Sequence, residues 1–216
     1  MTPVYKLSAN SVKNGRTVYG SMLAGNPVYV VPTAFQSIAT VSVGSGGAAN
    51  VEFTSIPATY THLQVRAFGQ TNRATFGFDS MRVQFNGVSG ASGGSGYTRH
   101  GISGNGSSAS AFGADSSGSD NDCQFAWALG TTTGSSWGTG IIDILDYANT
   151  NKYKTIRSIG GVDLNGTVGG LGGFVGLGSN LFLPNTNAIT SIKLIPFVGS
   201  TISQYSSFAL YGIKGA

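Results

Sequence analysis

Alternating apolar and polar residues constrain this chain more than any other feature. In the stretch HLQVRAFG, residues 62–69, the apolar Leu63, Val65 and Ala67 are separated by polar side chains. The stretch MRVQFNG, residues 81–87, repeats the alternation and ends in Asn-Gly, which accommodates the positive φ angles of a tight hairpin turn. Successive side chains of a strand point to opposite faces, so both stretches predict half-buried strands. No window shows sustained helical periodicity, and the sequence therefore predicts an all-β protein.

Two stretches near the C-terminus are apolar on both faces, TSIKLIPFVG (residues 190–199) and SSFALYGIKG (residues 206–215). Such strands are expected in the middle of a sheet that is covered on both sides, so a second sheet has to lie over the first. We therefore expect residues 35–216 to form an antiparallel β-sandwich of the jelly-roll-like kind. The glycine-rich stretches 87–122 and 160–180 are expected to be long loops or loosely paired edge strands.

The N-terminal segment, residues 1–34, differs in character from the rest. It offers only short apolar pairs separated by Asn-Gly and Gly-Asn-Pro, which is too little burial for a domain of its own. We expect an extended arm that acquires order on a partner. Lys6, Lys13 and Arg16 precede the first acidic residue, Glu52, so an acidic partner surface would suit the arm.

Charge is scarce along the whole chain. Of its 216 residues, 40% are hydrophobic and only 9% are charged, which excludes the low hydrophobicity and high charge of disordered proteins. The net charge is +4, but the basic residues stand singly and lack the patterns of nucleic-acid-binding proteins. No segment has the length of a membrane span or the pattern of a signal peptide. We therefore expect synthesis in a cytosol, no nucleic-acid partner and no membrane insertion. The surface is expected to be polar through uncharged residues, as is common in extracellular and virion β proteins.

Metal and cofactor motifs are missing from the sequence. Cys123 is the single cysteine, so we expect a small buried side chain and no disulfide or cysteine-based zinc site. Asp115, Asp120 and Asp122 offer oxygens to calcium, but the spacing of a calcium loop is absent and a solvated loop is expected. The glycine run at 90–96 does not lead into Gly-Lys-Ser or Gly-Lys-Thr, as a phosphate loop would. No cofactor and no metal are expected.

The most charge-dense stretch, IDILDYANTNKYKTIRSIGG, contains two carboxylates, Asp143 and Asp146. The carboxyl groups of a retaining glycosidase lie about 5 Å apart, and those of an inverting enzyme lie further apart. Residues three apart in an extended strand face opposite sides and lie roughly 10 Å apart. An acid/base pair would therefore need a break in the strand, and a structural role is expected instead.

The same stretch predicts a β-hairpin. A strand over 141–147 would lead into a turn at 148–151 and a return strand that carries Lys152, Lys154 and Arg157. Opposed strands would bring the acidic residues near these bases as cross-strand pairs that mainly set the register.

A receptor or glycan site would use aromatic rings beside polar loops, because a ring stacks on the apolar face of a sugar while polar neighbours bind its hydroxyls. The alternative, that these aromatic residues belong to the core or anchor loops, stays open. The candidates are Tyr97, Arg99, His100, Trp127 and Trp137.

Several sequence segments resemble those of a family of bacteriophage virion proteins, described as tail fibre or related structural proteins, and follow one another in the same order as in that family. They cover most of residues 37–214 and include VQFNG, GIIDILDYANTNKYKT, NAITSIKLIPFVG and SSFALYGIKG. The resemblance implies a non-enzymatic β-sandwich, commonly trimeric and displayed on the particle. It also implies a corner at Ser55, Ile56 and Pro57 that leads into a central strand, and it transfers no binding residue.

Three functions follow as expectations. The first is a trimeric tail fibre or spike component in a virion assembled in the host cytoplasm, attached by residues 1–34 and contacting host-surface glycan through its sandwich loops. The second is a capsid decoration or cement protein that clamps neighbouring subunits. The third, from another class, is a small glycan-cleaving enzyme that uses Asp143 and Asp146. We expect no enzyme.

Overall fold

The computed structural model describes residues 34–88, 96–114, 123–131, 133, 135–168 and 171–215. These residues form β-strands, turns and loops without a helix, so the prediction of an all-β protein is confirmed. The expected arm, residues 1–34, lies outside the described residues except for Ala34. The strands are β1 (Phe35–Ser42), β2 (Val51–Phe53), β3 (His62–Thr71), β4 (Phe78–Phe85), β5 (Tyr97–Gly104), β6 (Ala109–Ala114), β7 (Cys123–Thr131), β8 (Gly138–Ile144), β9 (Lys154–Val168), β10 (Leu171–Phe182), β11 (Ile192–Pro196) and β12 (Ser207–Ile213).

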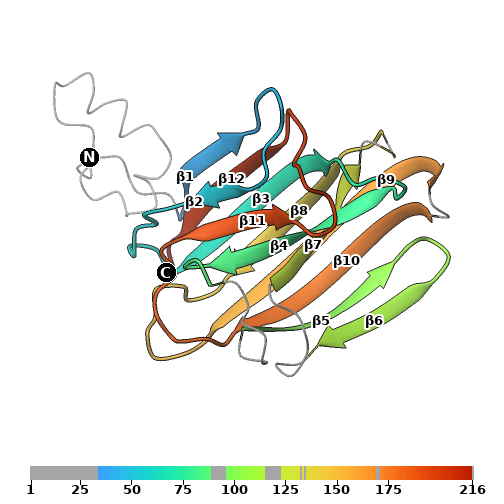
Figure 1. The fold of residues 1–216 in the computed structure, drawn as a ribbon. Helices are drawn as coiled ribbons and strands as arrows, with labels where there is room; N and C mark the ends of the chain where they lie inside the picture. Colours follow the sequence, from blue (N-terminus) through green and yellow to red (C-terminus); the bar gives the residue numbers. More distant parts are fainter. Residues whose placement is uncertain are drawn as a thin grey trace, which may run out of the picture.

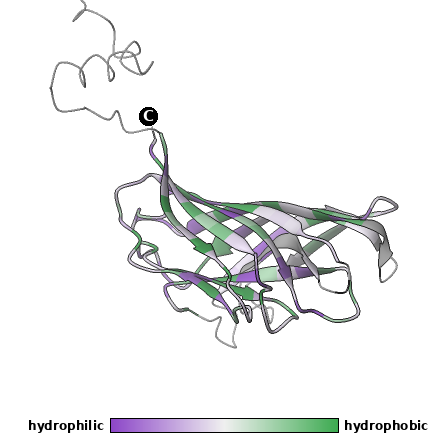
Figure 2. Cartoon of the chain, turned by 90° about the horizontal axis from the view of Figure 1, so that it is seen from above, coloured by the Kyte–Doolittle hydropathy of each residue, from purple (hydrophilic) through white to green (hydrophobic). Residues whose placement is uncertain are grey.

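The strands lie in two layers (Figures 1 and 2). The larger layer has the order β1-β12-β3-β8-β9-β10-β5-β6 and the smaller layer the order β2-β11-β4-β7, with antiparallel neighbours in both. A short parallel contact joins the layers where Gln70 and Thr71 of β3 pair with Gly130 and Thr131 of β7. The expected likeness to a jelly roll stays a prediction.

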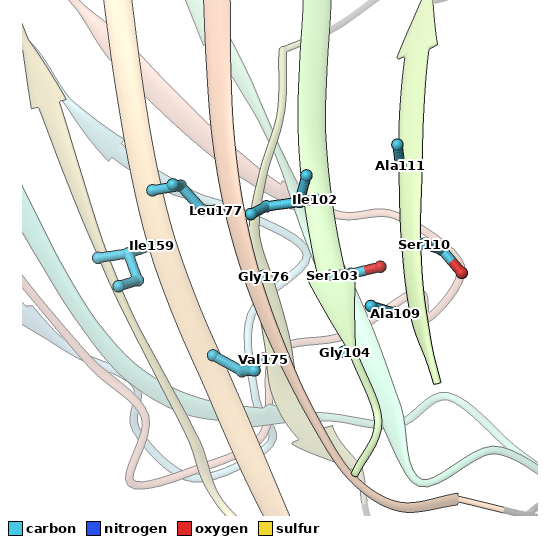
Figure 3. A pocket seen from close by; sticks show the side chains of 10 residues that line it. All are labelled: Ile102, Ser103, Gly104, Ala109, Ser110, Ala111, Ile159, Val175, Gly176 and Leu177. Carbon is cyan, nitrogen blue, oxygen red and sulfur yellow. The ribbon is translucent and has the colours of Figure 1, made fainter. Parts of the chain in front are cut away.

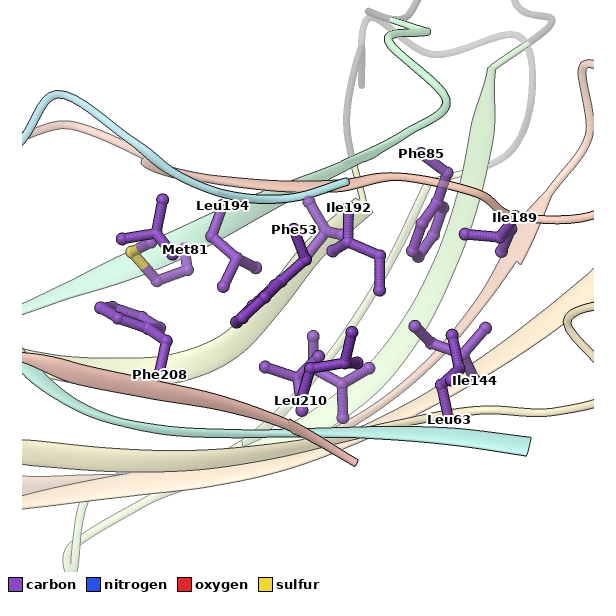
Figure 4. Packing of buried hydrophobic residues seen from close by; sticks show 14 of the residues in the cluster. Phe53, Leu63, Met81, Phe85, Ile144, Ile189, Ile192, Leu194, Phe208 and Leu210 are labelled. Carbon is purple, nitrogen blue, oxygen red and sulfur yellow. The ribbon is translucent and has the colours of Figure 1, made fainter. Parts of the chain in front are cut away.

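The main hydrophobic core lies between the layers. Figure 4 shows side chains of the smaller layer pointing toward those of the larger layer. The alternation that predicted β3 and β4 is confirmed, because Leu63, Val65, Met81, Val83 and Phe85 are each fully buried. Burying a side chain of this size contributes roughly 1.5–3 kcal/mol to folding.

The two apolar C-terminal strands differ in part from the prediction. Both are central, since β11 lies between β2 and β4 and β12 lies between β1 and β3. However, only one face of each is buried, and the residues of the other face are half-exposed. The apolar residues of these outer faces are therefore partly open to solvent.

The Asn-Gly turn after β4 is present as predicted. Asn86 and Gly87 have φ angles of 53° and 70°, and the backbone N–H of Val88 donates to the carbonyl of Phe85 at 2.9 Å. The Asn86 side chain then accepts the backbone N–H of Thr190 at 2.8 Å. This turn thereby positions the chain that enters β11.

The glycine-rich stretch 160–180 was expected to be loop or edge strand, and that prediction is wrong. It forms most of β9 and β10, and β10 is an interior strand because β9 and β5 pair with its two sides. Ladder hydrogen bonds use only the backbone, so glycines form them as other residues do. A Cβ at Gly101 of β5 would lie 2.2 Å from Cζ of Phe112, which shows how closely this ring covers the glycine. The other stretch, 87–122, contributes β5 and β6.

A buried tyrosine holds the corner before β3. The hydroxyl of Tyr147 donates to the carbonyl of Pro57 and accepts the backbone N–H of Tyr60 at 3.4 Å. Ile56 is buried at the same corner. Burial of the Tyr147 hydroxyl raises its pKa, with the hydrogen bond from the Tyr60 backbone opposing.

We predict that Tyr147→Phe lowers the free energy of unfolding by about 1–2 kcal/mol, because the Pro57 carbonyl loses its side-chain donor. Urea denaturation followed by tryptophan fluorescence measures the change. Tyr205→Phe is the matched control, since Tyr205 is 73% exposed, and we expect it to leave the midpoint unchanged. Equal effects of the two substitutions would contradict the role assigned to the Tyr147 hydroxyl.

Candidate functional site

The predicted hairpin is present, and it pairs one of its two aspartates across the strands. Its first strand ends at Ile144 instead of 147, and Lys152 lies in the connection before β9 and not on the return strand. Asp143 of β8 accepts Nε and Nη2 of Arg157 on β9, at 3.2 and 2.7 Å. On the other side it accepts Nε2 of Gln64 on β3 at 2.7 Å. The three residues are direct cross-strand neighbours, so their side chains share one face of the larger layer. This is the cross-strand pairing that the sequence predicted.

Asp146 lies in the turn after β8, with a φ angle of 48°. Its carboxylate forms an ion pair with Lys152, and its Oδ1 lies 3.5 Å from Nδ1 of His62. The backbone N–H of Asp146 donates to the same His62 nitrogen at 2.9 Å. The hydrogen bond from Lys152 lowers the pKa of Asp146, and partial desolvation opposes it.

Lys154 does not pair with an aspartate, contrary to the prediction. It is fully buried, and its Nζ donates to the carbonyls of Asn149, Lys152 and Thr186. Burial lowers its pKa, the charge of Lys152 lowers it further, and Asp146 partly offsets both. Lys154 therefore ties the hairpin turn to the segment between β10 and β11.

A second buried charged side chain, Asp79 of β4, was missed by the sequence analysis. Its carboxylate accepts the hydroxyl of Thr71 at 2.9 Å and the backbone N–H groups of Val198 and Gly199 at 3.2 and 2.8 Å. The guanidinium of Arg73 lies 4.0 Å away. These contacts fix the loop after β11 to the β3–β4 connection, which is a structural role.

The proposed glycan-site residues do not gather in one place. Tyr97 is 2% exposed, and its hydroxyl donates to the Val88 carbonyl and accepts the Phe85 N–H. Its ring therefore belongs to the core, so the expectation of a sugar-stacking Tyr97 is corrected. Its neighbour Arg99 lies over the ring of Phe112, with Cζ 5.8 Å from the centroid.

The remaining candidates lie elsewhere. His100 is exposed, on the opposite side of β5 from Tyr97. Trp137 stacks on Phe68 of β3, with ring centroids 5.4 Å apart and an interplanar angle of 12°. The Trp127 side chain lies outside the described residues, as do Asp115, Asp120 and Asp122 and the Cys123 side chain.

The most distinctive surface is apolar, and the sequence analysis missed it. We call it the apolar face and define it by six residues of β5, β6, β9 and β10. They line a hollow of about 530 Å³ on the side of the larger layer that points away from the smaller one (Figure 3). Four of them are large side chains, each with between 43% and 60% of its surface exposed to solvent. The six residues are Ile102, Ala109, Ala111, Ile159, Val175 and Leu177.

A polar row borders the apolar face. Arg157, Ser179 and His100 are direct neighbours across β9, β10 and β5, and they line a second hollow that shares Ile102 and Leu177 with the first. The alternation of Val175 and Leu177 with glycines was the available indication in the sequence. It was missed because the stretch was taken for a loop.

Metal binding and membrane spanning find no support among the described residues. They contain no group of three or more histidine, cysteine or acidic side chains placed to hold a metal ion. They also contain no helix of the length and hydropathy needed to cross a bilayer.

The fold and its surface define a layered all-β protein whose described charged groups are largely engaged in structural contacts. No family model, curated protein or solved structure matches the chain. The resemblance to phage virion proteins therefore stays a prediction.

The ion pair of Asp146 predicts a contribution to acid stability. Because the folded pKa lies below the ordinary value of 3.8, the stabilising contribution is present above that pH and is lost as the pH falls through the folded pKa. Urea midpoints measured from pH 7 to pH 2 should fall less steeply at the acid end for Asp146→Asn than for the native chain. Asparagine tolerates the positive φ angle, so the backbone is preserved. Parallel pH curves for the two proteins would contradict the assignment.

Proposed function

We propose that the protein is a non-enzymatic structural component of a bacteriophage particle, a homotrimeric tail fibre or spike attached through residues 1–34. The family resemblance supports the biological setting. The observation that carries the non-enzymatic role is the engagement of the carboxylates. Asp79, Asp143, Asp146 and Glu52 each contact backbone amides or basic side chains that belong to the scaffold.

The contacts of the two hairpin aspartates argue against acid/base chemistry. A catalytic carboxylic acid needs a raised pKa, commonly from an apolar pocket. The pKa of Asp146 is lowered instead, by Lys152. Asp143 is bound by Arg157 in a two-point contact that competes with a substrate for its oxygens.

The surface chemistry supports a structural role in a particle. The larger layer is hydrogen-bonded from β1 to β6, so pulling forces along the sheet are shared by many backbone hydrogen bonds. Few charges and a face made of aliphatic side chains favour contact with protein more than with a hydrated glycan. Host-glycan binding through the loops remains part of the proposal, with Trp137 in the loop before β8 and His100 on the exposed side of β5 as the accessible candidates.

Immunogold electron microscopy tests the placement. Antibody against the chain should label the tail of the phage particles whose genome encodes it, and particles assembled with a chain lacking residues 1–34 should lose the label. Label on the head would contradict the fibre assignment and identify the decoration-protein alternative. Particles without any label would contradict the virion role.

A hydrolysis assay tests the absence of enzymatic activity. The native chain and Asp143→Asn, incubated with surface polysaccharide of the host, should both release no reducing ends above the buffer control. Hydrolysis by the native chain that disappears in Asp143→Asn would overturn the non-enzymatic proposal. Tyr205→Phe is the control for an unrelated surface change.

A further inference from the structure

We infer that the apolar face, with the edge of β6 beside it, is a contact surface for a second copy of this chain. The inference deepens the proposed structural role and rests on it for its biological setting. Its physical basis is the side-chain pattern of the four strands at one end of the larger layer (Figures 1 and 3).

The pattern consists of two rows of directly opposed residues. The first row runs Ile159, Leu177, Ile102 and Ala111, and the second runs Gly161, Val175, Gly104 and Ala109, each across β9, β10, β5 and β6. Both rows point away from the core, because the intervening residues of β9 and β10 are buried. The glycines of the second row keep part of the face flat, and a partner backbone can approach it closely.

The apolar face is unusual for a surface in contact with water. Ile102 is 60% exposed, Val175 is 56% exposed, and no charged side chain lies within the two rows. The next row on the same face, with Arg157 and His100, is polar as a solvated sheet face normally is. A contiguous apolar patch rimmed by polar residues marks an interaction site.

The edge of β6 continues this surface. Among the described strands, β6 pairs only with β5, without a register shift, and its sequence ASAFGA has no charge and no proline. Natural sheets protect their edges with charges, prolines, bulges or short strands. The other edges have such protection: β1 contains a register shift, β7 pairs with β4 through two register shifts, and β2 has three residues and carries Glu52. In the described part of the chain, the outer edge of β6 has no neighbouring strand.

A second copy is the occupant that these observations favour. A surface that is always apolar needs a partner that is always present, and another copy of the same chain is made at the same time and place. An edge strand pairs with its own copy antiparallel, which gives a self-complementary, twofold contact. This contact is therefore separate from the threefold contact of the proposed trimer and would join chains of two trimers. With a net charge of +4, two copies approach best where the surface carries no charge.

The size of the face is compatible with this contact. The two rows span about four residues of each strand, or about 13 Å, and four strands are about 19 Å wide, which gives a flat area of roughly 250 Å². A standard interface buries about 800 Å² per partner. The apolar face would therefore form the centre of such an interface, and the polar row and the β6 edge, which border it, would form the rim.

Light scattering coupled to size-exclusion chromatography tests the inference on the full chain. The native protein should be an oligomer, and Ile102→Asp and Leu177→Asp should each weaken self-association about tenfold or more. Tyr205→Asp adds the same charge at an exposed side chain outside the apolar face and should keep the native mass. Unchanged circular dichroism and melting temperature would show that the variants fold.

Hydrogen exchange locates the contact. Amides of β6 should be protected in the native oligomer and should exchange faster in Ile102→Asp. A monomeric native protein would overturn the inference, and so would an oligomer whose mass and β6 protection survive both substitutions. These results would not change the immunogold labelling expected from the proposed function. Conversely, an oligomeric protein that the antibody does not detect on particles would contradict the proposed function and not the contact surface.

Discussion

Burial of alternate side chains between two layers of strands is the interaction on which the rest of this structure depends. It directs Leu63, Met81 and Leu210 into one core and turns their sequence neighbours outward. Charged groups are then found in two environments, exposed and buried. Most lie on outer faces and in turns, while Lys154 and Asp79 are buried and satisfied by backbone groups. The scarcity of charge in the chain fits a fold in which few buried positions offer a charged group enough backbone partners.

Alternation made β3 and β4 predictable, because each has one apolar and one polar face. The turn and the opposed charges on its two sides made the β8–β9 hairpin predictable. The same alternation places Lys154 on the buried face of β9 together with Ile156. It was not predicted to be buried because a lysine is seldom assigned to a core. Its three carbonyl acceptors come from turns, and their convergence depends on tertiary structure. Tyr97 was misplaced for a similar reason, since its hydroxyl partners belong to the turn after β4.

The glycine-rich strands show where the periodicity argument ends. In β10, the inward positions on both sides of Leu177 are the glycines Gly176 and Gly178, so the sequence around Leu177 shows a single apolar row and does not reveal a two-sided strand. Alternation shows that a strand has two different faces, but it does not show which face is exposed to solvent. Only the register across β9, β10, β5 and β6 brings the aliphatic side chains into contiguous rows. The pairing of Asp143 with Arg157 was predictable, whereas the apolar face required knowledge of the strand order.

The position of β12 has a consequence for how the chain is made. This last strand lies between β1 and β3, so the first described strand is hydrogen-bonded along its length only to the last, with Phe35 opposite Ile213. A ribosome has to deliver nearly the whole chain before this part of the layer can close. Such long-range pairing slows folding and exposes unpaired edges meanwhile. Chains that lack β12 therefore leave the facing edges of β1 and β3 unpaired, so a C-terminal deletion removes the hydrogen-bonding partner of the first described strand.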